Sequence, residues 1–394
     1  MASVVKLYPD GKLFWVNDMP HDIGDDNKIE PKQESKVELA GSLDTSLPVQ
    51  WTCLLNEART RNGKYSIPHY VLQGYADDGP PALDQIAETC KIIEEVIAAG
   101  QALAIFCPAG KEFASHRHFS AHCVAAHAVL ARSMNPSEVA ALFPEISFLQ
   151  NSWVRATNPA ANQRLLTLEA CMKALALASE RKWFDYATFD SQGYLDRWNY
   201  YDVTWFVKDE VSICADPNST VADPDPNTAK YLTMDGAPEG TDPKAAFSTM
   251  FEADKVKLIV RLNMGHEMGQ LPTYDPLVFE KQGVAHIDTS FPDLHGGCPS
   301  NEIVKRIIDK CNEVPGDCAV TFHCKAGFGR SAVCAVLWLI YKHNLPGDLV
   351  FAWLRHARAG SITTPTQTKY LLKLKGREDI EAMMKDKPAC CAIS

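Results

Sequence analysis

The stretch Cys318–His343, CAVTFHCKAGFGRSAVCAVLWLIYKH, decides the fold of this chain. Its first residues, CAVTF, form a short apolar run typical of a buried strand, and AVCAVLWLIYKH repeats apolar residues at helical spacing. Between these runs lie Gly327 and Gly329, which allow the backbone to turn tightly. The pattern predicts a strand, a tight loop and a helix, with Cys324 near the start of the loop and Arg330 at its end.

The same order of elements occurs earlier in the chain. PALDQIAETCKIIEEVIAAG predicts a helix, ALAIF predicts a strand that ends before Cys107, and HFSAHCVAAHAVLARSM predicts a second helix. NPSEVAALF predicts a further helix, with Asn135 as its cap and Pro136 at the first helical position. In the second copy, NEIVKRIIDKCNEV and LPGDLVFAWLRHAR are the corresponding flanking helices. We therefore predict an α/β protein with two similar domains in tandem, each a central mixed sheet flanked by helices.

A helical linker is expected between the two domains, because LTLEACMKALALASERKWFDYATFDSQGYLDRW reads as a long helix followed by a shorter one. The predicted parts are a first domain, a linker, a second domain and a flexible tail: 1–160, 161–200, 201–378 and 379–394. A stretch within 214–245 is dense in Pro, Gly and Asp and is expected to be a loop or insertion.

Composition restricts the classes of function. The 394 residues carry a net charge of −10, which argues against binding to a nucleic-acid backbone and suits basic partners. The 13 cysteines are an odd number in a long chain whose N-terminus shows no secretory pattern, so an intracellular, reducing location is expected. No run approaches the roughly 20 apolar residues of a membrane span.

The loop residues indicate phosphoryl chemistry. A turn that leads directly into a helix directs several backbone N–H groups at one point, where they can bind a dianion and stabilise Cys324 as a nucleophilic thiolate. Arg330 can present a planar fork to two phosphoryl oxygens. Ser331 can donate to the sulfur, and His323 is expected to order the loop from behind. Each residue alone has a simpler reading, in which Cys324 is a small buried side chain and Arg330 a surface charge.

The loop HCKAGFGRS matches the Cys-x5-Arg-Ser/Thr signature of protein tyrosine and dual-specificity phosphatases, and the wider chain resembles the cell-division-cycle-fourteen family of dual-specificity phosphatases. The resemblance extends over roughly 65–375 and includes ADDGPPALDQIAETCKII, KLIVRLN, PSNEIVKRI and AWLRHARAGSITTP. It implies two tandem phosphatase-like domains, the first inactive and the second catalytic. Phe113 stands six residues after Cys107, so the first loop lacks the signature arginine.

The resemblance also implies the remaining site residues. A general acid is expected before the nucleophile, and Asp293 of SFPDLHGGCPSNE matches its position, with Asp288 as the competing candidate. Gln367 either positions the attacking water or is an exposed turn residue. The expected substrate-binding loop consists of Lys325, Ala326, Gly327, Phe328 and Gly329. The chemistry proceeds through a phosphocysteine and requires no metal or cofactor.

Two loop positions differ from the family pattern. Phe328 stands where a smaller aliphatic residue is usual, and Ala332 replaces a glycine. We expect these changes to alter the shape of the pocket and the rate rather than to abolish activity.

A histidine-rich helix raises a second possibility. His118, His122, Cys123 and His127 fall close together in HRHFSAHCVAAH. Zinc sites usually show closed sets of four ligands at tighter spacing, so we interpret these residues as packed or polar helix positions.

The sequence ends in KPACCAIS, which fits a C-a-a-X farnesylation motif at Cys391, with Cys390 beside it for palmitoylation. This predicts a cytoplasmic protein attached peripherally to a membrane, with the nucleus or cytoskeletal structures as other locations. The alternative is a disordered tail that ends in this way by chance.

Three functions are compatible with these residues. The first is a protein phosphatase acting on phosphoserine, phosphothreonine or phosphotyrosine, with proline-directed sites and nearby basic residues implied by the family. The second is a phosphoinositide or lipid phosphatase at a membrane. The third is a phosphate-binding module without catalysis. Lipid phosphatases often carry several basic residues in this loop, whereas this one offers only Lys325 besides Arg330.

Overall fold

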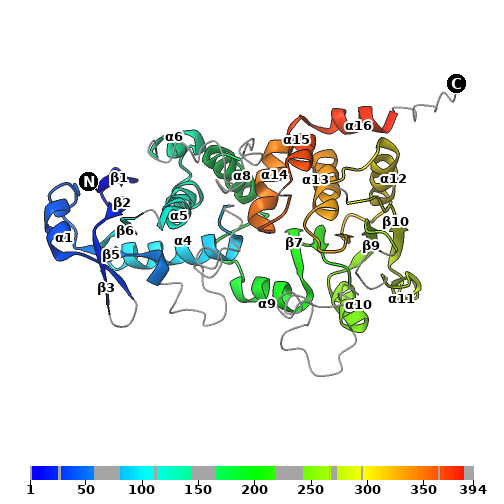
Figure 1. Ribbon diagram of the computed structural model, residues 1–394, viewed down its shortest axis with the longest axis horizontal. Coiled ribbons are helices and arrows are strands. Elements are labelled where there is room, and N and C mark those ends of the chain that lie inside the picture. The colour runs from blue at the N-terminus through cyan, green and yellow to red at the C-terminus, as the bar shows by residue number, and fades with distance from the viewer. Residues whose placement is uncertain are drawn as a thin grey trace. The chain divides into compact units, whose positions relative to one another are not determined.

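The computed structural model describes residues 2–24, 28–56, 80–110, 113–143, 166–217, 243–265, 267, 273–293, 296–362 and 364–385. The chain divides into two compact units, Met1–Ser191 and Gln192–Ser394, called unit 1 and unit 2 below. Figure 1 labels their helices and strands.

Unit 1 is built on a four-stranded sheet with the strand order β1-β2-β6-β5. Its strands are β1 (Ser3–Lys6), β2 (Leu13–Met19), β5 (Val49–Thr52) and β6 (Ala102–Pro108). β1 runs antiparallel to β2, whereas β5 and β2 both run parallel to β6. A short hairpin of β3 (His21–Ile23) and β4 (Ile29–Pro31) follows β2. All seven residues of β6 are buried, as expected for a central parallel strand.

The helices of unit 1 begin and end largely where their sequences indicate. They are α1 (Gln33–Ala40), α4 (Leu83–Ala98), α5 (Ala114–Arg132), α6 (Pro136–Ala141) and α8 (Leu168–Glu180). The Asn135 side chain accepts hydrogen bonds from the N–H groups of Ser137 at 2.9 Å and Glu138 at 3.3 Å, which confirms the predicted cap of α6. The buried face of α4 repeats at helical spacing, from Leu83 through Ile86, Cys90 and Ile93.

Unit 2 is built on a five-stranded sheet with the strand order β10-β9-β11-β8-β7. The strands are β7 (Val203–Val207), β8 (Val211–Cys214), β9 (Val256–Arg261), β10 (Ala285–Asp288) and β11 (Ala319–His323). All neighbours are parallel except β7, which pairs antiparallel with β8. The central strand is β11, so the carboxyl ends of β8, β9 and β11 lie side by side at one edge of the sheet. Such an edge is where open α/β sheets commonly bind ligands.

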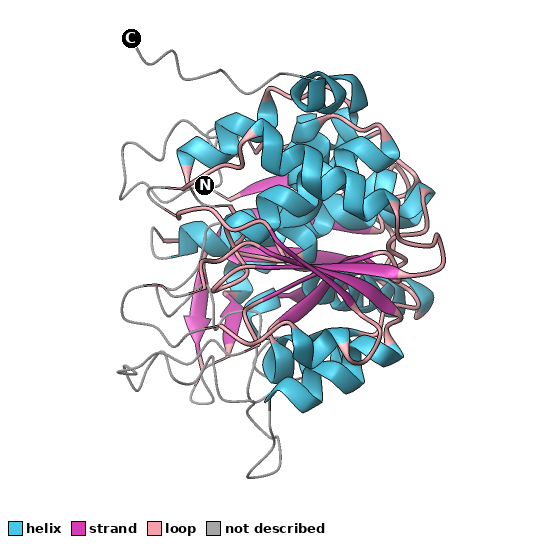
Figure 2. Ribbon diagram, turned by 90° about the vertical axis from the view of Figure 1, so that its right-hand side faces the viewer, coloured by secondary structure: helices cyan, strands magenta, loops and turns pink. Residues whose placement is uncertain are grey.

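Helices cover both sides of the unit 2 strands, as Figure 2 shows. They are α9 (Ser191–Tyr201), α10 (Pro243–Ala253), α11 (Leu277–Glu280), α12 (Asn301–Asn312), α13 (Arg330–His343), α14 (Gly347–Ala357), α15 (Pro365–Leu372) and α16 (Arg377–Lys385). Phe251 of α10 and Phe279 of α11 pack with Ile259 and Cys214 in one apolar cluster. The first eleven residues of α13 are all buried, so this helix forms the core against β11 and β8.

The fold class predicted from the sequence is confirmed: each unit is a mixed sheet flanked by helices. The division at 191/192 falls inside the predicted linker 161–200, whose two expected helices appear as α8 and α9. The exact domain boundaries stay predictions. The 218–242 part of the expected insertion, together with Cys390 and Cys391, lies outside the described residues. None of the described helices is long and apolar enough to cross a membrane.

Candidate active site

The predicted loop leaves the carboxyl end of β11 and enters α13. β11 ends at His323, Cys324 follows at once, and α13 begins at Arg330. The sulfur-bearing residue therefore lies below the N-terminal end of an almost entirely buried helix, where unsatisfied N–H groups and the helix dipole favour negative charge. Cys324 is 2% exposed.

The carbonyl groups of this loop are held by donors outside it. The Asp216 N–H donates to the Lys325 carbonyl at 3.1 Å, and the Ile362 N–H donates to the Phe328 carbonyl at 2.9 Å. The Arg358 Nε donates to the Gly327 carbonyl at 2.9 Å. Because a trans peptide is planar, each outward carbonyl turns the following N–H the opposite way.

Three N–H groups, those of Ala326, Phe328 and Gly329, are oriented in this manner. Among the described residues, none of them donates to another protein group. The loop thus offers a set of donors that an anion can use, which is the arrangement expected from the sequence.

Gly327 must be a glycine for two reasons. Its φ of +75° lies in the left-handed region, and a Cβ atom would lie 2.6 Å from both the Cys214 carbonyl oxygen and Arg358 Nη2. The backbone at this point therefore fits tightly between β8 and the Arg358 guanidinium.

The sulfur has a hydroxyl neighbour. Cys324 Sγ and Ser331 Oγ are 3.3 Å apart and both are buried. A hydroxyl at this distance can donate a hydrogen bond to a thiolate.

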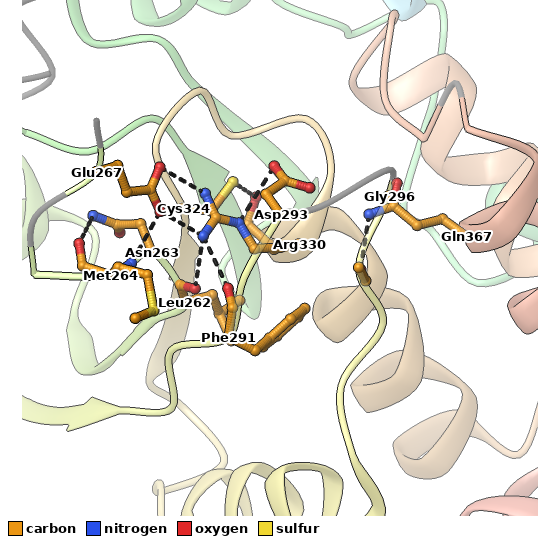
Figure 3. A network of polar contacts seen from close by, with 12 residues as sticks. Leu262, Asn263, Met264, Glu267, Phe291, Asp293, Gly296, Cys324, Arg330 and Gln367 are labelled. Carbon is orange, nitrogen blue, oxygen red and sulfur yellow. Dashed lines mark hydrogen bonds and ion pairs between the residues drawn. The ribbon is translucent and has the colours of Figure 1, made fainter. Parts of the chain in front are cut away.

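Arg330 is held firmly on one edge of its guanidinium, and Asp293 lies at the other edge (Figure 3). Glu267 accepts from Nη1 at 2.6 Å and from Nη2 at 3.1 Å, and the Phe291 carbonyl accepts from Nη1 at 3.0 Å. Nε makes no hydrogen bond with any described residue. Of the five N–H groups, those of Nε and one of Nη2 lie on the same edge of the plane and point the same way. That edge fits two phosphoryl oxygens while Glu267 keeps the other edge.

Glu267 was missed by the sequence analysis. Burial alone would raise its pKa, but hydrogen bonds from Arg330 and from the Met264 N–H lower the pKa below its usual value, so the carboxylate is charged at neutral pH. Its only sequence signal is its place in NMGHEMG, a glycine-containing segment that follows β9 at the same sheet edge as the loop. Acidic residues in such segments are common, and nothing local marks this one as a partner of Arg330.

The two candidate acids have different surroundings. An oxygen of Asp293 lies 3.4 Å from Arg330 Nε and forms an ion pair at the edge of the guanidinium opposite Glu267. Asp288 ends β10 and is paired with the Arg261 guanidinium through Nε and Nη2. Only Asp293 is therefore next to the loop, and Asp288 belongs to an ion pair with another arginine.

Gln367 is not an exposed turn residue, and that alternative from the sequence is wrong. It lies in α15, is 1% exposed, and its Nε2 donates to the Gly297 carbonyl at 3.1 Å. A Cβ atom on Gly329 would lie 3.3 Å from Gln367 Nε2 and 3.8 Å from an Asp293 oxygen. The Gln367 amide and an Asp293 oxygen therefore both lie near Gly329, at the same end of the loop.

His323 lies behind the loop, as expected. Its Nδ1 is 3.4 Å from the Cys324 carbonyl, and its Nε2 is 2.6 Å from the Tyr274 hydroxyl, which is also 3.0 Å from His286 Nε2. Burial lowers the pKa of His323 to about 4. The ring is therefore neutral at pH 7 and acts as a hydrogen-bonded support.

Lys325 does not extend into solvent. Its side chain is 8% exposed and its ammonium lies 3.9 Å from Asp216, whose carboxylate also accepts from Asn263 Nδ2 at 2.8 Å. Burial lowers the pKa of Lys325, and the charges of Asp216 and Glu267 oppose that effect. The neighbouring Ala326 is exposed and Phe328 is half-buried, so these two side chains border the loop.

The corresponding cysteine of unit 1 has other neighbours. Cys107 Sγ lies 3.5 Å from the Pro108 carbonyl and 3.9 Å from the Phe113 carbonyl, and burial raises the pKa of this thiol to about 12. Arg117, from the first turn of α5, lies near Cys107 and lowers its pKa to a smaller extent. Its Nη2 donates to an Asp18 oxygen at 2.5 Å. The sequence analysis did not predict this arginine near the thiol, because it stands ten residues after the cysteine.

The histidines of α5 are largely packed, as interpreted from the sequence. His122 and His127 are fully buried, and His127 Nε2 and Nδ1 lie 2.7 Å from Glu94 and 2.5 Å from the Tyr8 hydroxyl. Burial lowers the pKa of His127 to about 4.

Comparison with known proteins finds tyrosine-protein phosphatases and dual specificity protein phosphatases. No protein-family model matches the chain. The tyrosine-protein phosphatase cdc-14 of Caenorhabditis elegans is 26% identical over 336 residues, which is 83% of this chain and 43% of the relative. The tyrosine-protein phosphatase CDC14 homolog of Schizosaccharomyces pombe is 40% identical over 125 residues, or 32% of this chain and 22% of the relative. The dual specificity protein phosphatase CDC14A of Mus musculus is 29% identical over 204 residues, or 51% and 30%.

The chain thus spans less than half the length of each of these curated relatives. Among solved structures, PTPMT1 matches with a TM-score of 0.35 and 18% identity, covering 46% of this chain and 96% of that one. A mutant form of Tk-PTP matches with a TM-score of 0.33 and 24% identity, covering 45% and 97%.

Proposed function

We propose that this protein is a cysteine-dependent phosphatase that hydrolyses phosphomonoesters on proteins. The observation that carries the proposal is the convergence of four groups at the N-terminus of α13. Cys324 Sγ faces the Ser331 hydroxyl at 3.3 Å, Arg330 follows the same loop, and Asp293 lies 3.4 Å from the Arg330 Nε. The similarity to tyrosine-protein and dual specificity phosphatases supports the same activity.

In the first step, the Cys324 thiolate attacks phosphorus, so that an S–P bond forms while the ester P–O bond breaks. Asp293 gives its proton to the departing oxygen, which leaves as an alcohol or phenol. Arg330 binds two of the phosphoryl oxygens through Nε and Nη2, and the loop N–H groups bind the others as charge develops. The product of this step is a phosphocysteine.

In the second step, water attacks the phosphorus and the S–P bond breaks. Asp293, now a carboxylate, takes a proton from the water, and Ser331 donates to the leaving sulfur. We propose that Gln367 holds the water, which is supported by the position of its amide near Gly329 at the same end of the loop as Asp293. Glu267 keeps Arg330 in one orientation through both steps.

The charge around the loop favours a substrate with one phosphate. Lys325, the second cation of the loop, is buried against Asp216 and does not present its ammonium at the surface. A lipid headgroup with several phosphates requires more exposed cations than this loop provides. We therefore propose phosphoserine, phosphothreonine or phosphotyrosine in proteins as the substrate class, with proline-directed phosphoserine sites and nearby basic residues, as the family resemblance implies.

A competition experiment tests the substrate class. Hydrolysis of an aryl phosphate is measured while a phosphoserine-proline-lysine peptide or a short-chain phosphoinositide is added as a competing substrate, and the phosphate released from each is counted. The proposal expects the peptide to compete at lower concentration and to be dephosphorylated. Preferential hydrolysis of the phosphoinositide would contradict the protein-substrate proposal, and peptide binding without any phosphate release from either compound would contradict the enzymatic one.

A further inference from the structure

Arg358 is completely buried behind the Cys324 loop, and the proposed mechanism does not use it directly. Its guanidinium donates hydrogen bonds both to the Cys324 loop and to the residue that follows α9. Nε donates to the Gly327 carbonyl at 2.9 Å, and Nη2 donates to the Asp202 carboxylate at 2.7 Å. The Lys325 and Phe328 carbonyls accept from backbone N–H groups, whereas the Gly327 carbonyl between them accepts from a side chain.

Two aromatic rings cover the same guanidinium. Its Cζ lies 4.6 Å from the centroid of the Phe328 ring and 5.1 Å from that of the Trp198 ring. The rings themselves are 6.2 Å apart, centroid to centroid, and tilted by 49°. A guanidinium removed from water gains substantially from such contacts. Phe328 is also the loop residue expected from the sequence to alter the shape of the pocket.

Helix α9 and the residue after it supply the Trp198 ring and the Asp202 carboxylate that contact Arg358. Tyr194 and Trp198 lie four residues apart on one face of α9, and Asp202 directly follows the last residue of the helix. The Tyr194 hydroxyl donates to the Ala357 carbonyl at 3.2 Å, and its ring lies 6.1 Å from that of Trp198. All three residues therefore contact Arg358, the residue before it, or each other.

We propose that Arg358 is a positioning residue, held by Asp202 and covered by Phe328 and Trp198, which fixes the Gly327–Phe328 peptide with its N–H turned toward the anion. With that carbonyl released, the peptide at Gly327 can rotate, because glycine adopts either hand of φ at little cost. The loop then loses one of its donors to the sulfur and to the bound phosphoryl group. On this basis α9 helps to position the Cys324 loop, in addition to its place in the predicted linker. This inference rests on the proposed function.

The test uses the full chain and two readouts that a purely structural role would leave unchanged. The first is the pH midpoint of Cys324 alkylation by iodoacetate, followed by mass spectrometry. The second is the inhibition of aryl phosphate hydrolysis by vanadate, which occupies the phosphoryl site. Trp198→Leu removes a ring that lies outside the loop, Trp198→Phe retains a ring, and Arg358→Lys retains the charge without the fork.

We expect Trp198→Leu and Arg358→Lys to raise the alkylation midpoint by at least about 0.5 pH unit and to weaken vanadate inhibition about three- to tenfold. Trp198→Phe is expected to keep values close to those of the wild type. Tyr341→Leu is the matched control, because it removes another arene contact of unit 2, with Arg377 at 5.3 Å, away from the loop. Its Tm is expected to fall without a change in either readout.

A folded Trp198→Leu protein with wild-type midpoint and inhibition would overturn the inference. If that variant does not fold, Phe328→Leu is measured in the same way, and unchanged values would again overturn it. The proposed function fails separately, since it requires the wild-type Cys324 itself to alkylate well below the midpoint of an ordinary thiol.

Discussion

The two cysteine loops of this chain begin alike and differ in what surrounds the sulfur. Cys107 is the second-to-last residue of β6 and begins the sequence Cys-Pro-Ala-Gly, whereas Cys324 follows the end of β11 and begins Cys-Lys-Ala-Gly. Carbonyl oxygens face Cys107 Sγ at 3.5 and 3.9 Å, whereas a hydroxyl faces Cys324 Sγ at 3.3 Å. Carbonyl oxygens accept a hydrogen bond from a neutral thiol and repel a thiolate, whereas a hydroxyl can donate a hydrogen bond to a thiolate. The two sulfurs therefore have neighbours of opposite kinds.

The arginines differ in their helical positions. Arg330 begins α13 directly after the loop, with Glu267 on one edge of its guanidinium and Asp293 3.4 Å from Nε. Arg117 lies in the first turn of α5 and is paired with Asp18. Phe113 takes the position that corresponds to Arg330. The two loops therefore meet their arginines from different places in the following helix.

The largest effect is expected from Cys324→Ser. A serine hydroxyl at this place is a far weaker nucleophile than a thiolate, so turnover of an aryl phosphate should fall by at least about 10⁴-fold. Cys107→Ser, the matched change in the first loop, should leave kcat within about twofold. Equal losses in both variants would remove the distinction between the two loops.

Arg330→Lys should have the next largest effect. A lysine retains the charge but cannot bind two phosphoryl oxygens side by side, so kcat/KM should fall about 10²- to 10³-fold. Arg117→Lys is the control in the first loop, and we expect it to alter Tm rather than kcat/KM. Steady-state kinetics of both variants check this, and unchanged kinetics of Arg330→Lys would argue against its role.

Asp293→Asn is expected to lower kcat about 10²-fold or more, with a smaller loss on an aryl phosphate whose leaving group needs no proton. Asp288→Asn breaks the pair with Arg261 and should lower Tm while kcat changes little. Comparing alkyl and aryl phosphates for both variants decides between the two acids. A leaving-group dependence that appears in Asp288→Asn instead would reverse the assignment.

The smallest effect is expected at His323, the residue before Cys324. It concerns the stability of unit 2 at acidic pH. Burial lowers the pKa of His323 to about 4, below the usual 6.5 or so of an unfolded chain. Between these values the unfolded chain binds more protons, so the stability of unit 2 falls as pH drops from about 6.5 toward 4.

Phe106 occupies the equivalent place in unit 1, and the change His323→Phe copies it. Loss of the titrating group should reduce the fall in stability between pH 7.5 and 5.5 by about 1 kcal/mol. Urea unfolding at the two pH values measures the difference. An unaltered pH dependence would show that His323 does not titrate in this way.

The sequence predicted the parts of the site that are local. The strand, the loop and the helix around Cys324 are contiguous, and their apolar spacing and glycines are sufficient to predict them. The same holds for the cap at Asn135. Glu267, Asp216 and Arg358 were not predicted as neighbours of the loop, because they reach it from separate loops and helices and only the folded sheet edge brings them together.

The first loop shows the same limit. The absence of an arginine six residues after Cys107 was read correctly from the sequence, but the approach of Arg117 depends on how α5 turns and on Asp18, which comes from the end of β2. A motif with fixed spacing predicts only the residues that it names. It does not predict a side chain such as Arg117, which lies near the cysteine but stands outside that spacing. Gln367 is a similar case, since a turn-like segment, TPTQT, forms the start of a helix and buries the amide.

The central claim is that Cys324 lies in a loop that binds a phosphoryl anion and Cys107 does not. Iodoacetate labelling of the full chain at neutral pH, with and without vanadate and with both cysteines quantified by mass spectrometry, tests this most directly. We predict that Cys324 is labelled and is protected by vanadate, whereas Cys107 stays unlabelled. Labelling of Cys324 that vanadate does not reduce, or equal labelling of Cys107, would contradict the account.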